Sequence, residues 1–287
     1  MLTATRSGPR STTPRKPRLG VIKFASCDGC QLTLLDLEDR LLDLAATFDI
    51  VEFAEASSHR STGPFDLVLV EGSISTPEQL EQIIDIRRQT PLLVTIGACA
   101  TAGGIQALRN WRDHGQIHEA VYAMPGYVDS LATSTPIADH VTVDAELRGC
   151  PIDPSQLLEL LTALAVGRRP QLPDEAVCLE CKRRGTVCVL VARDLPCLGP
   201  VTHTGCGAMC PAFDRGCYAC FGPREAANAS SLATWFGRDG TRSPAEVAAL
   251  FSGFTAYATP FQAVIDELGG PPGPSAVTRP PEEAHDA

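Results

Sequence analysis

Twelve cysteines in a chain of 287 residues are the side chains whose number and spacing most clearly predict chemistry. Four are spread over the first half of the chain: Cys27, Cys30, Cys99 and Cys150. The other eight crowd into one stretch of the second half: Cys178, Cys181, Cys188, Cys197, Cys206, Cys210, Cys217 and Cys220. A cubane iron–sulfur cluster binds four thiolates. The cysteines therefore predict three 4Fe-4S clusters, which together would conduct electrons.

Disulfide bonds are the first alternative to metal ligation. Disulfide frameworks belong to small secreted domains that cannot bury enough apolar surface, whereas 44% of this long chain is hydrophobic. Residues 1–18 are rich in Ser, Thr, Pro, Arg and Lys and hold no apolar stretch of the kind an export signal requires. We therefore expect a cytoplasmic protein whose cysteines are reduced.

Charge and hydropathy exclude two classes of partner. The formal net charge is −10, and no concentrated basic segment offers the clustered Lys and Arg that phosphate binding needs. No apolar run approaches the roughly 18 residues of a membrane span. We expect neither nucleic-acid binding nor a direct membrane span.

The segment before the cysteine-rich stretch predicts alternating strands and helices. We expect strands over residues 19–24, 50–53, 67–70, 92–96 and 141–143, and helices over 31–48, 78–88 and 154–166. This alternation is typical of an α/β fold with a flavodoxin-like, doubly wound parallel sheet. Two later helices, near 244–251 and 260–268, should cover a cysteine-rich and largely irregular iron–sulfur domain.

Composition divides the chain into four parts. We expect a disordered arm over residues 1–17 and a flavodoxin-like domain with one cluster over 18–167. A C-terminal domain with two clusters should span 168–269, and a Pro-rich disordered tail 270–287.

The first four cysteines each follow a predicted strand. Open α/β sheets bind ligands beyond the carboxyl ends of their strands, so these thiols should meet at one edge of the sheet. Such sheets also bind flavins or nucleotides, and a flavin-binding reductase is the competing interpretation. The first strand-to-helix turn, FASCDGCQ, has neither a GxGxxG pattern nor a Walker lysine, and cysteines stand where phosphate-binding glycines would be expected.

The eight later cysteines allow two kinds of metal. The elements CLECKRRGTVC, GCGAMCP and CYAC contain paired cysteines that can also hold zinc, which would make this part a zinc-stabilised adaptor. The Cys210–Pro211 dipeptide is typical of ferredoxin ligation and favours iron–sulfur clusters. The spacing does not show which four cysteines share a cluster.

Four stretches resemble one family over most of the chain. KPRLGVIKFASCDGCQLTLLDLE, EGSI at residues 71–74, VTIGACATAGG around Cys99 and GCP at Cys150 resemble the small subunit of nickel-iron hydrogenases. A complex I subunit of about 20 kDa is a more distant relative. The resemblance implies that Cys27, Cys30, Cys99 and Cys150 bind a proximal 4Fe-4S cluster beside the nickel-iron centre of a separate large subunit.

The cysteine-rich half indicates which types of hydrogenase small subunit the chain resembles most. Its compact CLEC, GCGAMCP and CYAC set is similar to the delta subunit of cytosolic bidirectional, NAD(P)-linked hydrogenases of the sulfhydrogenase type, and to the small subunit of deazaflavin-reducing hydrogenases. The first type implies a flavin-containing diaphorase subunit with FAD and NAD(P), and a further iron–sulfur subunit, as additional partners.

Several polar residues have a functional and an ordinary interpretation. Glu71 ends a predicted strand beside the first cysteines, where it would relay protons or only cap the next helix. Lys182, Arg183 and Arg184 would favour docking of an acidic partner or form a solvated charge run. His203 would replace a cysteine as ligand or remain outside the cluster, which we expect because eight thiols suffice for two clusters.

Overall fold

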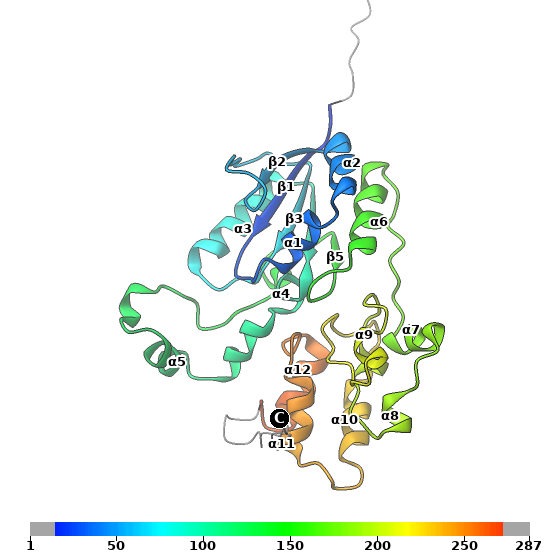
Figure 1. Cartoon of the computed structure of the whole chain (residues 1–287). Coiled ribbons are helices and arrows are strands. Elements are labelled where there is room, and N and C mark those ends of the chain that lie inside the picture. Colours follow the sequence, from blue (N-terminus) through cyan, green and yellow to red (C-terminus); the bar gives the residue numbers. More distant parts are fainter. Residues whose placement is uncertain (1–14, 272–287) are drawn as a thin grey trace, which may run out of the picture.

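The computed structural model describes residues 15–271, so the predicted arm and tail lie almost wholly outside the described residues. Its centre is a parallel sheet with the strand order β2-β1-β3-β4-β5 (Figure 1). The strands are β1 (Arg18–Lys23), β2 (Asp49–Phe53), β3 (Leu67–Glu71), β4 (Leu92–Ile96) and β5 (Ala145–Leu147). This is the flavodoxin-like order, and it confirms the predicted fold class.

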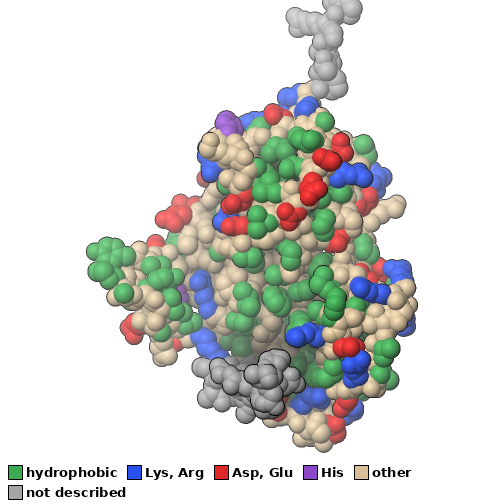
Figure 2. Space-filling view, viewed as in Figure 1, with side chains coloured by type: hydrophobic (Ala, Val, Ile, Leu, Met, Phe, Trp, Pro, Cys, Tyr) green, Lys and Arg blue, Asp and Glu red, His purple; other side chains and the backbone are tan. Residues whose placement is uncertain are grey.

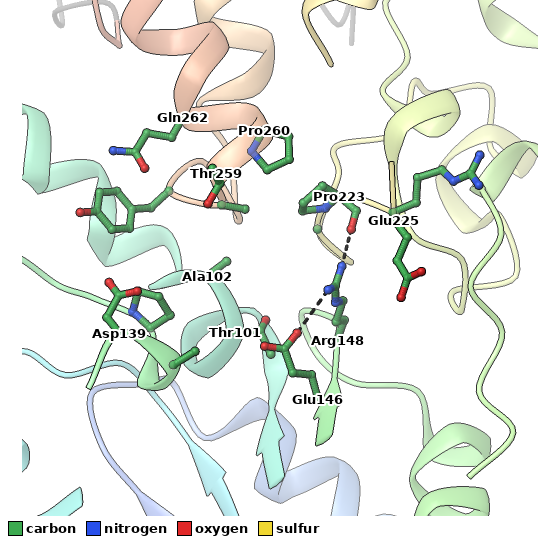
Figure 3. Close-up of a pocket in the computed structure, with 16 residues that line it drawn as sticks. Thr101, Ala102, Asp139, Glu146, Arg148, Pro223, Glu225, Thr259, Pro260 and Gln262 are labelled. Atoms are coloured by element: carbon green, nitrogen blue, oxygen red, sulfur yellow. Dashed lines mark hydrogen bonds and ion pairs between the residues drawn. The ribbon is translucent and has the colours of Figure 1, made fainter. Parts of the chain in front are cut away.

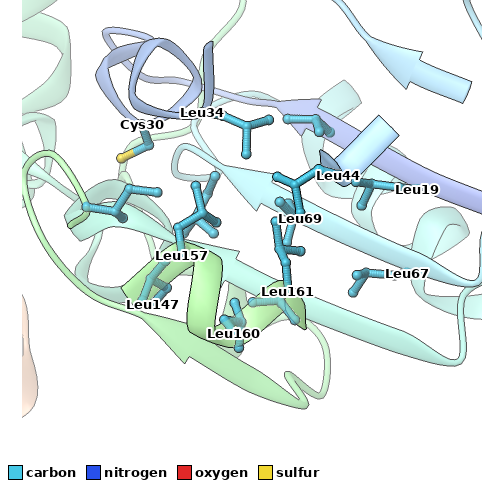
Figure 4. Close-up of a cluster of buried hydrophobic side chains, with 14 of the residues drawn as sticks. Leu19, Cys30, Leu34, Leu44, Leu67, Leu69, Leu147, Leu157, Leu160 and Leu161 are labelled. Carbon is cyan, nitrogen blue, oxygen red and sulfur yellow. The ribbon is translucent and has the colours of Figure 1, made fainter. Parts of the chain in front are cut away.

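Helices cover both faces of the sheet because its central strands are apolar on both sides. On one face Leu67 and Leu69 pack towards α1 (Gly29–Leu35), α2 (Asp39–Thr47) and α6 (Pro154–Ala165), and Cys30 lies at one end of this leucine layer (Figure 4). On the other face Val68 and Val70 pack against α3 (Pro77–Gln89). Continuous apolar runs of this kind are what a parallel sheet buried on both faces requires.

The prediction of a strand over 141–143 is wrong, because the fifth strand begins at Ala145. The Asp144 carboxylate accepts the Leu93 N–H at 2.7 Å, and the Asp144 N–H donates to the Leu93 carbonyl at 2.9 Å, so pairing with β4 starts there. Val141 and Val143 instead pack as partly buried side chains against the core on the α3 face of the sheet. Their β-branched side chains favour a strand at residues 141–143, but the residues that pair with β4 lie later in the chain.

The single helix predicted over 31–48 is also wrong, because α1 and α2 are separate. Glu38 adopts a φ of 51°, which a right-handed helix cannot include. The leucine spacing continues across this break, so the side chains reach the same core although the helix does not. The other predicted helices match α3 and α6 within about two residues at each end.

The chain beyond α6 forms a separate, mainly helical part below the carboxyl edge of the sheet, which we call the cysteine-rich body (Figure 1). It begins with short helices around the cysteines, α7 (Val177–Arg184), α8 (Val189–Ala192), η4 (Gly199–Val201) and α9 (Met209–Ala212). It ends with α10 (Ala229–Gly237), α11 (Pro244–Phe251) and α12 (Thr259–Glu267). The last two confirm predicted helices, whereas α10 was not predicted.

A projecting arm between β4 and β5 was not predicted. After α4 (Gly97–Ala102), the chain runs through η1 (Ile105–Trp111), α5 (His114–Val121) and η2 (Pro125–Tyr127), and returns to the sheet at η3 (Ile137–Asp139). Figure 2 shows apolar side chains gathered at its tip, where Val121, Met124 and Tyr127 are exposed. Over residues 15–271, no helix combines the length and apolar character needed to cross a bilayer.

Three phenylalanines hold the last helices together. Phe236, Phe251 and Phe261 are almost fully buried, and consecutive ring centroids lie 6.4 and 5.7 Å apart. We expect Phe236→Ala to lower the free energy of unfolding by about 3–5 kcal/mol, because it removes a buried ring and leaves a cavity. Urea unfolding would measure this loss. Tyr127→Ala, at an 81% exposed position, is the matched control and should change the free energy by no more than about 0.5 kcal/mol.

Candidate metal centre

The first four cysteines meet at the carboxyl edge of the sheet, as their positions after strands predict. Cys27 follows β1, Cys30 lies in the first turn of α1, Cys99 lies on α4 directly after β4, and Cys150 follows β5. The Ala98 N–H donates to the Gly149 carbonyl at 2.7 Å, so the segments that carry Cys99 and Cys150 are joined by their backbones. We call Cys27, Cys30, Cys99 and Cys150 the sheet quartet.

The thiols of the sheet quartet act on one another electrostatically. Burial raises the pKa of Cys30, and the charges of Glu71, Cys99 and Cys150 raise it further. Burial likewise raises the pKa of Cys99 to about 11, with smaller contributions from Cys150 and Cys27. Thiolates in this position therefore require a cationic partner to be stable. A bound metal provides this positive charge and deprotonates the thiols that coordinate it.

Glycines make room for the sulfur atoms. At Gly97, whose φ is +85°, an added Cβ would overlap Cys30 Sγ, and at Gly104, whose φ is +69°, it would lie 2.7 Å from Cys99 Sγ. Only glycine combines these backbone conformations with such a close approach. Two of the glycines around Cys99 are thus explained by the space that two thiols occupy, whereas a Cβ at Gly103 would meet Ala107 and Ser134.

Glu71 lies inside this site. Its carboxylate is 2% exposed and accepts hydrogen bonds from the Cys30 N–H at 3.2 Å and from Gln31 Nε2 at 2.9 Å. Burial raises the pKa of Glu71 above its ordinary value, although these hydrogen bonds oppose the shift. Glu71 therefore touches the backbone of a candidate ligand, and it does not cap α3, whose N-cap is Thr76.

The electrostatic partners of the eight later cysteines favour a division into two groups, although Cys181 also interacts with Cys206 and Cys197 with Cys210. Burial raises the pKa of Cys178 to about 11, and the charges that add to this come from Cys197, Cys181 and Cys188. We call Cys178, Cys181, Cys188 and Cys197 the outer quartet. Its Cys188 is exposed, whereas Cys197 is buried.

The last four cysteines lie between the other two groups. Burial raises the pKa of Cys220 to about 12, and the added charges come from Cys206 and Cys210 of its own group and from Cys150 of the sheet quartet. We call Cys206, Cys210, Cys217 and Cys220 the inner quartet. On its far side, the Cys217 N–H donates to Cys197 Sγ of the outer quartet at 3.2 Å. The inner quartet is therefore in contact with both neighbours.

The donor sets fit iron–sulfur clusters in chemistry and number. Each group consists of four thiols, which is the ligand set of a cubane. Backbone N–H groups point at several of the sulfurs. Among them, Ala219 donates to Cys217 Sγ at 3.4 Å, and Cys217 donates to Cys197 Sγ at 3.2 Å. Within residues 15–271, no three His, Cys, Asp or Glu side chains are grouped as ligands of a single metal ion. A four-iron cluster is larger than one ion and holds its thiolates farther apart.

A polar cleft of about 430 Å³ lies where the sheet meets the cysteine-rich body (Figure 3). Arg148, two residues before Cys150, lies between the Glu146 carboxylate and the Pro223 carbonyl and donates to both. Since Pro223 follows the inner quartet, Arg148 joins the segments that carry Cys150 and Cys220.

The remaining candidates are placed as follows. Arg183 pairs with Glu175 at 3.4 Å, and Arg184 donates to the Gly207 carbonyl at 3.0 Å, so two members of the basic run contact neighbouring chain segments. The Nδ1 atom of His203 lies 2.7 Å from the Thr204 carbonyl, and burial lowers the pKa of this imidazole. The position of His203 outside the ligand set stays a prediction.

Comparisons with known proteins identify relatives of this chain. Residues 27–164 match the family model for the 20 kDa subunit of NADH ubiquinone oxidoreductase. The chain is 39% identical over 206 residues to the sulfhydrogenase 2 subunit delta of Pyrococcus furiosus, covering 72% of this chain and 86% of that one. It is also 30% identical over 273 residues to one subunit of the F420-non-reducing hydrogenase vhu of Methanococcus voltae, covering 84% and 95%.

A solved structure shows the same fold. One chain of an NAD⁺-reducing [NiFe]-hydrogenase in the H₂-reduced state superposes with a TM-score of 0.52 at 31% identity. The match covers 55% of this chain and 96% of that chain.

The close approach at Gly97 gives a specific test of the sheet quartet. We expect Gly97→Ala to lose about four iron atoms per chain, because its Cβ would occupy the space of Cys30 Sγ and its φ is unfavourable for alanine. Iron analysis of the anaerobically purified protein measures this loss. Gly126→Ala, whose Cβ would have no neighbour within 4 Å, should keep its iron. Full iron content in Gly97→Ala would contradict the assignment.

Proposed function

The chain belongs to the hydrogenase small-subunit family that includes sulfhydrogenase delta subunits, and from this premise we propose that it is an electron-transfer subunit with three 4Fe-4S clusters. Electrons would pass between a nickel-iron centre in a large subunit and a flavin module that reacts with NAD(P). The complex would operate in the cytoplasm, where thiols stay reduced. A diaphorase subunit and a further iron–sulfur subunit complete the proposed assembly.

The observation that carries the proposal is the spatial order of three cysteine quartets. The sheet quartet contacts the inner quartet through Cys150 and Cys220, and the inner quartet contacts the outer one through Cys217 and Cys197. Cys188 of the outer quartet is exposed. When bound at these three groups, the clusters would take up and release single electrons.

The residues of this chain would tune and protect the path. Burial of Cys30, Cys197 and Cys217 keeps solvent from the sulfurs. The N–H groups that point at Cys197 and Cys217 stabilise negative charge on sulfur, which favours the reduced form of a bound cluster. The basic residues of α7 lie close to the exposed Cys188 end and would favour an acidic electron partner there.

Metal analysis of the anaerobically purified complex tests this proposal. We expect about twelve iron atoms and twelve acid-labile sulfides per copy of this chain, because three cubanes each contain four of both. Nickel should follow a separate polypeptide. Zinc without sulfide would identify an adaptor instead, and flavin bound to this chain would identify a reductase.

Two cysteine variants should interrupt the path at opposite ends. Cys99→Ala should abolish hydrogen-driven reduction of every other cluster, because it removes a ligand of the sheet quartet. Cys188→Ala should leave hydrogen able to reduce the sheet and inner clusters but should strongly slow NAD(P) reduction. Electron paramagnetic resonance after exposure to hydrogen, with NAD(P)H formation measured in parallel, separates the two. Normal NAD(P) reduction by either variant would contradict the proposed path.

A further inference from the structure

Glu180 lies between the inner and outer quartets and belongs to neither. It stands on α7 next to Cys181, and α7 carries two members of the outer quartet. Its carboxylate reaches the loop that carries Cys206 of the inner quartet. Oε1 accepts the Gly205 N–H at 3.0 Å, and Oε2 accepts the Ala208 N–H at 3.0 Å and lies 4.0 Å from Cys206 Sγ.

The loop over residues 205–208 depends on such a partner. Positive φ values occur at three positions of this segment: 143° at Gly205, 66° at Gly207 and 54° at Ala208. The segment is therefore neither a right-handed helix nor an extended strand. Ala208 is buried, and its N–H would have no solvent to bond if the carboxylate were removed. The two N–H groups on either side of Cys206 are thus both satisfied by one side chain.

Arg184 holds the same loop from the next turn of α7. It donates to the Gly207 carbonyl at 3.0 Å. Residues four apart on a helix lie on the same face, so Glu180 and Arg184 bind the loop side by side. Glu180 is half-buried and Arg184 is exposed. Solvent and salt therefore screen the negative charge of Glu180 less than the positive charge of Arg184.

We propose that Glu180 is a positioning residue that fixes the inner-quartet loop to the helix of the outer quartet, and that its charge lowers the reduction potential of the cluster bound through Cys206. The inference rests on the proposed function, since it concerns a cluster at the inner quartet. A fixed negative charge beside a cluster disfavours the reduced form, which carries one more negative charge. Glu180 therefore biases the middle of the electron path against holding the electron.

Glu180→Gln in the intact complex tests the effect of the charge. The amide keeps the size of the side chain and one acceptor oxygen, so we expect iron content to be retained. The midpoint potential of the inner cluster should rise most, and that of the outer cluster should rise less, because Glu180 also acts on Cys181. Redox titration followed by electron paramagnetic resonance measures the potentials. Glu175→Gln is the matched control, because Glu175 is a neighbouring carboxylate that pairs with Arg183; it should leave all three potentials unchanged.

Arg184→Gln separates positioning from charge. It frees the Gly207 carbonyl but leaves the Glu180 carboxylate, so we expect several-fold faster proteolysis within residues 205–208 without an upward shift of any potential. Glu180→Gln should show both effects. If Glu180→Gln loses inner-cluster iron, Glu175→Gln must keep its iron, because loss in both variants would contradict a specific positioning role of Glu180.

The outcomes distinguish the two proposals. A wild-type complex without three cluster signals would contradict the proposed function, whatever the variants do. Three wild-type signals together with unshifted potentials and full iron in Glu180→Gln would overturn the role of Glu180 alone. A comparable shift in Glu175→Gln would also overturn it, because the effect would then belong to surface charge in general.

Discussion

The cost of burying thiolates is the constraint on which this structure depends. Desolvation is the largest cause of the raised pKa at cysteines in all three quartets, including Cys30, Cys178 and Cys220. Neighbouring cysteines raise it further, because several negative charges in one place repel each other. Only coordination to a cationic centre makes such groups stable as thiolates. The fold supplies the enclosure, and a metal cluster would supply the compensating charge.

The parallel sheet explains how four distant cysteines reach one enclosure. Strand ends in such a sheet open to the same edge, so segments after β1, β4 and β5 converge although they lie far apart in the chain. The Ala98 to Gly149 hydrogen bond fixes two of these segments to each other. Glycines at positions 97 and 104 then allow the backbone to approach the sulfurs. The sheet is therefore the scaffold of the first site and does not itself supply its chemistry.

The cysteine-rich body is organised by contacts of a different kind. Among residues 168–271 the structure describes no strand, and α7 is joined to the loop before α9 by side chain to backbone bonds. Glu180 and Arg184 bind the loop around Cys206, and Arg148 binds the Pro223 carbonyl across the junction with the sheet. Such contacts hold the segments that carry the three quartets next to one another. The hydrophobic packing of α10, α11 and α12 covers this body from one side.

The sequence by itself determined the fold class, the strand-end positions of the first four cysteines and the match to the hydrogenase small-subunit family. These follow from local patterns, since apolar periodicity selects strands and helices, and residue identity selects the ligand type. The tertiary structure alone decided where β5 begins. Pairing with β4 starts at Asp144, whereas the apolar pattern of Val141 and Val143 suggests an earlier start. It also decided that the last four cysteines in the chain have neighbours in both other groups, with Cys217 beside Cys197 and Cys220 beside Cys150. Spacing along the chain cannot show these neighbours, because they arise when the chain folds back and brings Cys220 against Cys150.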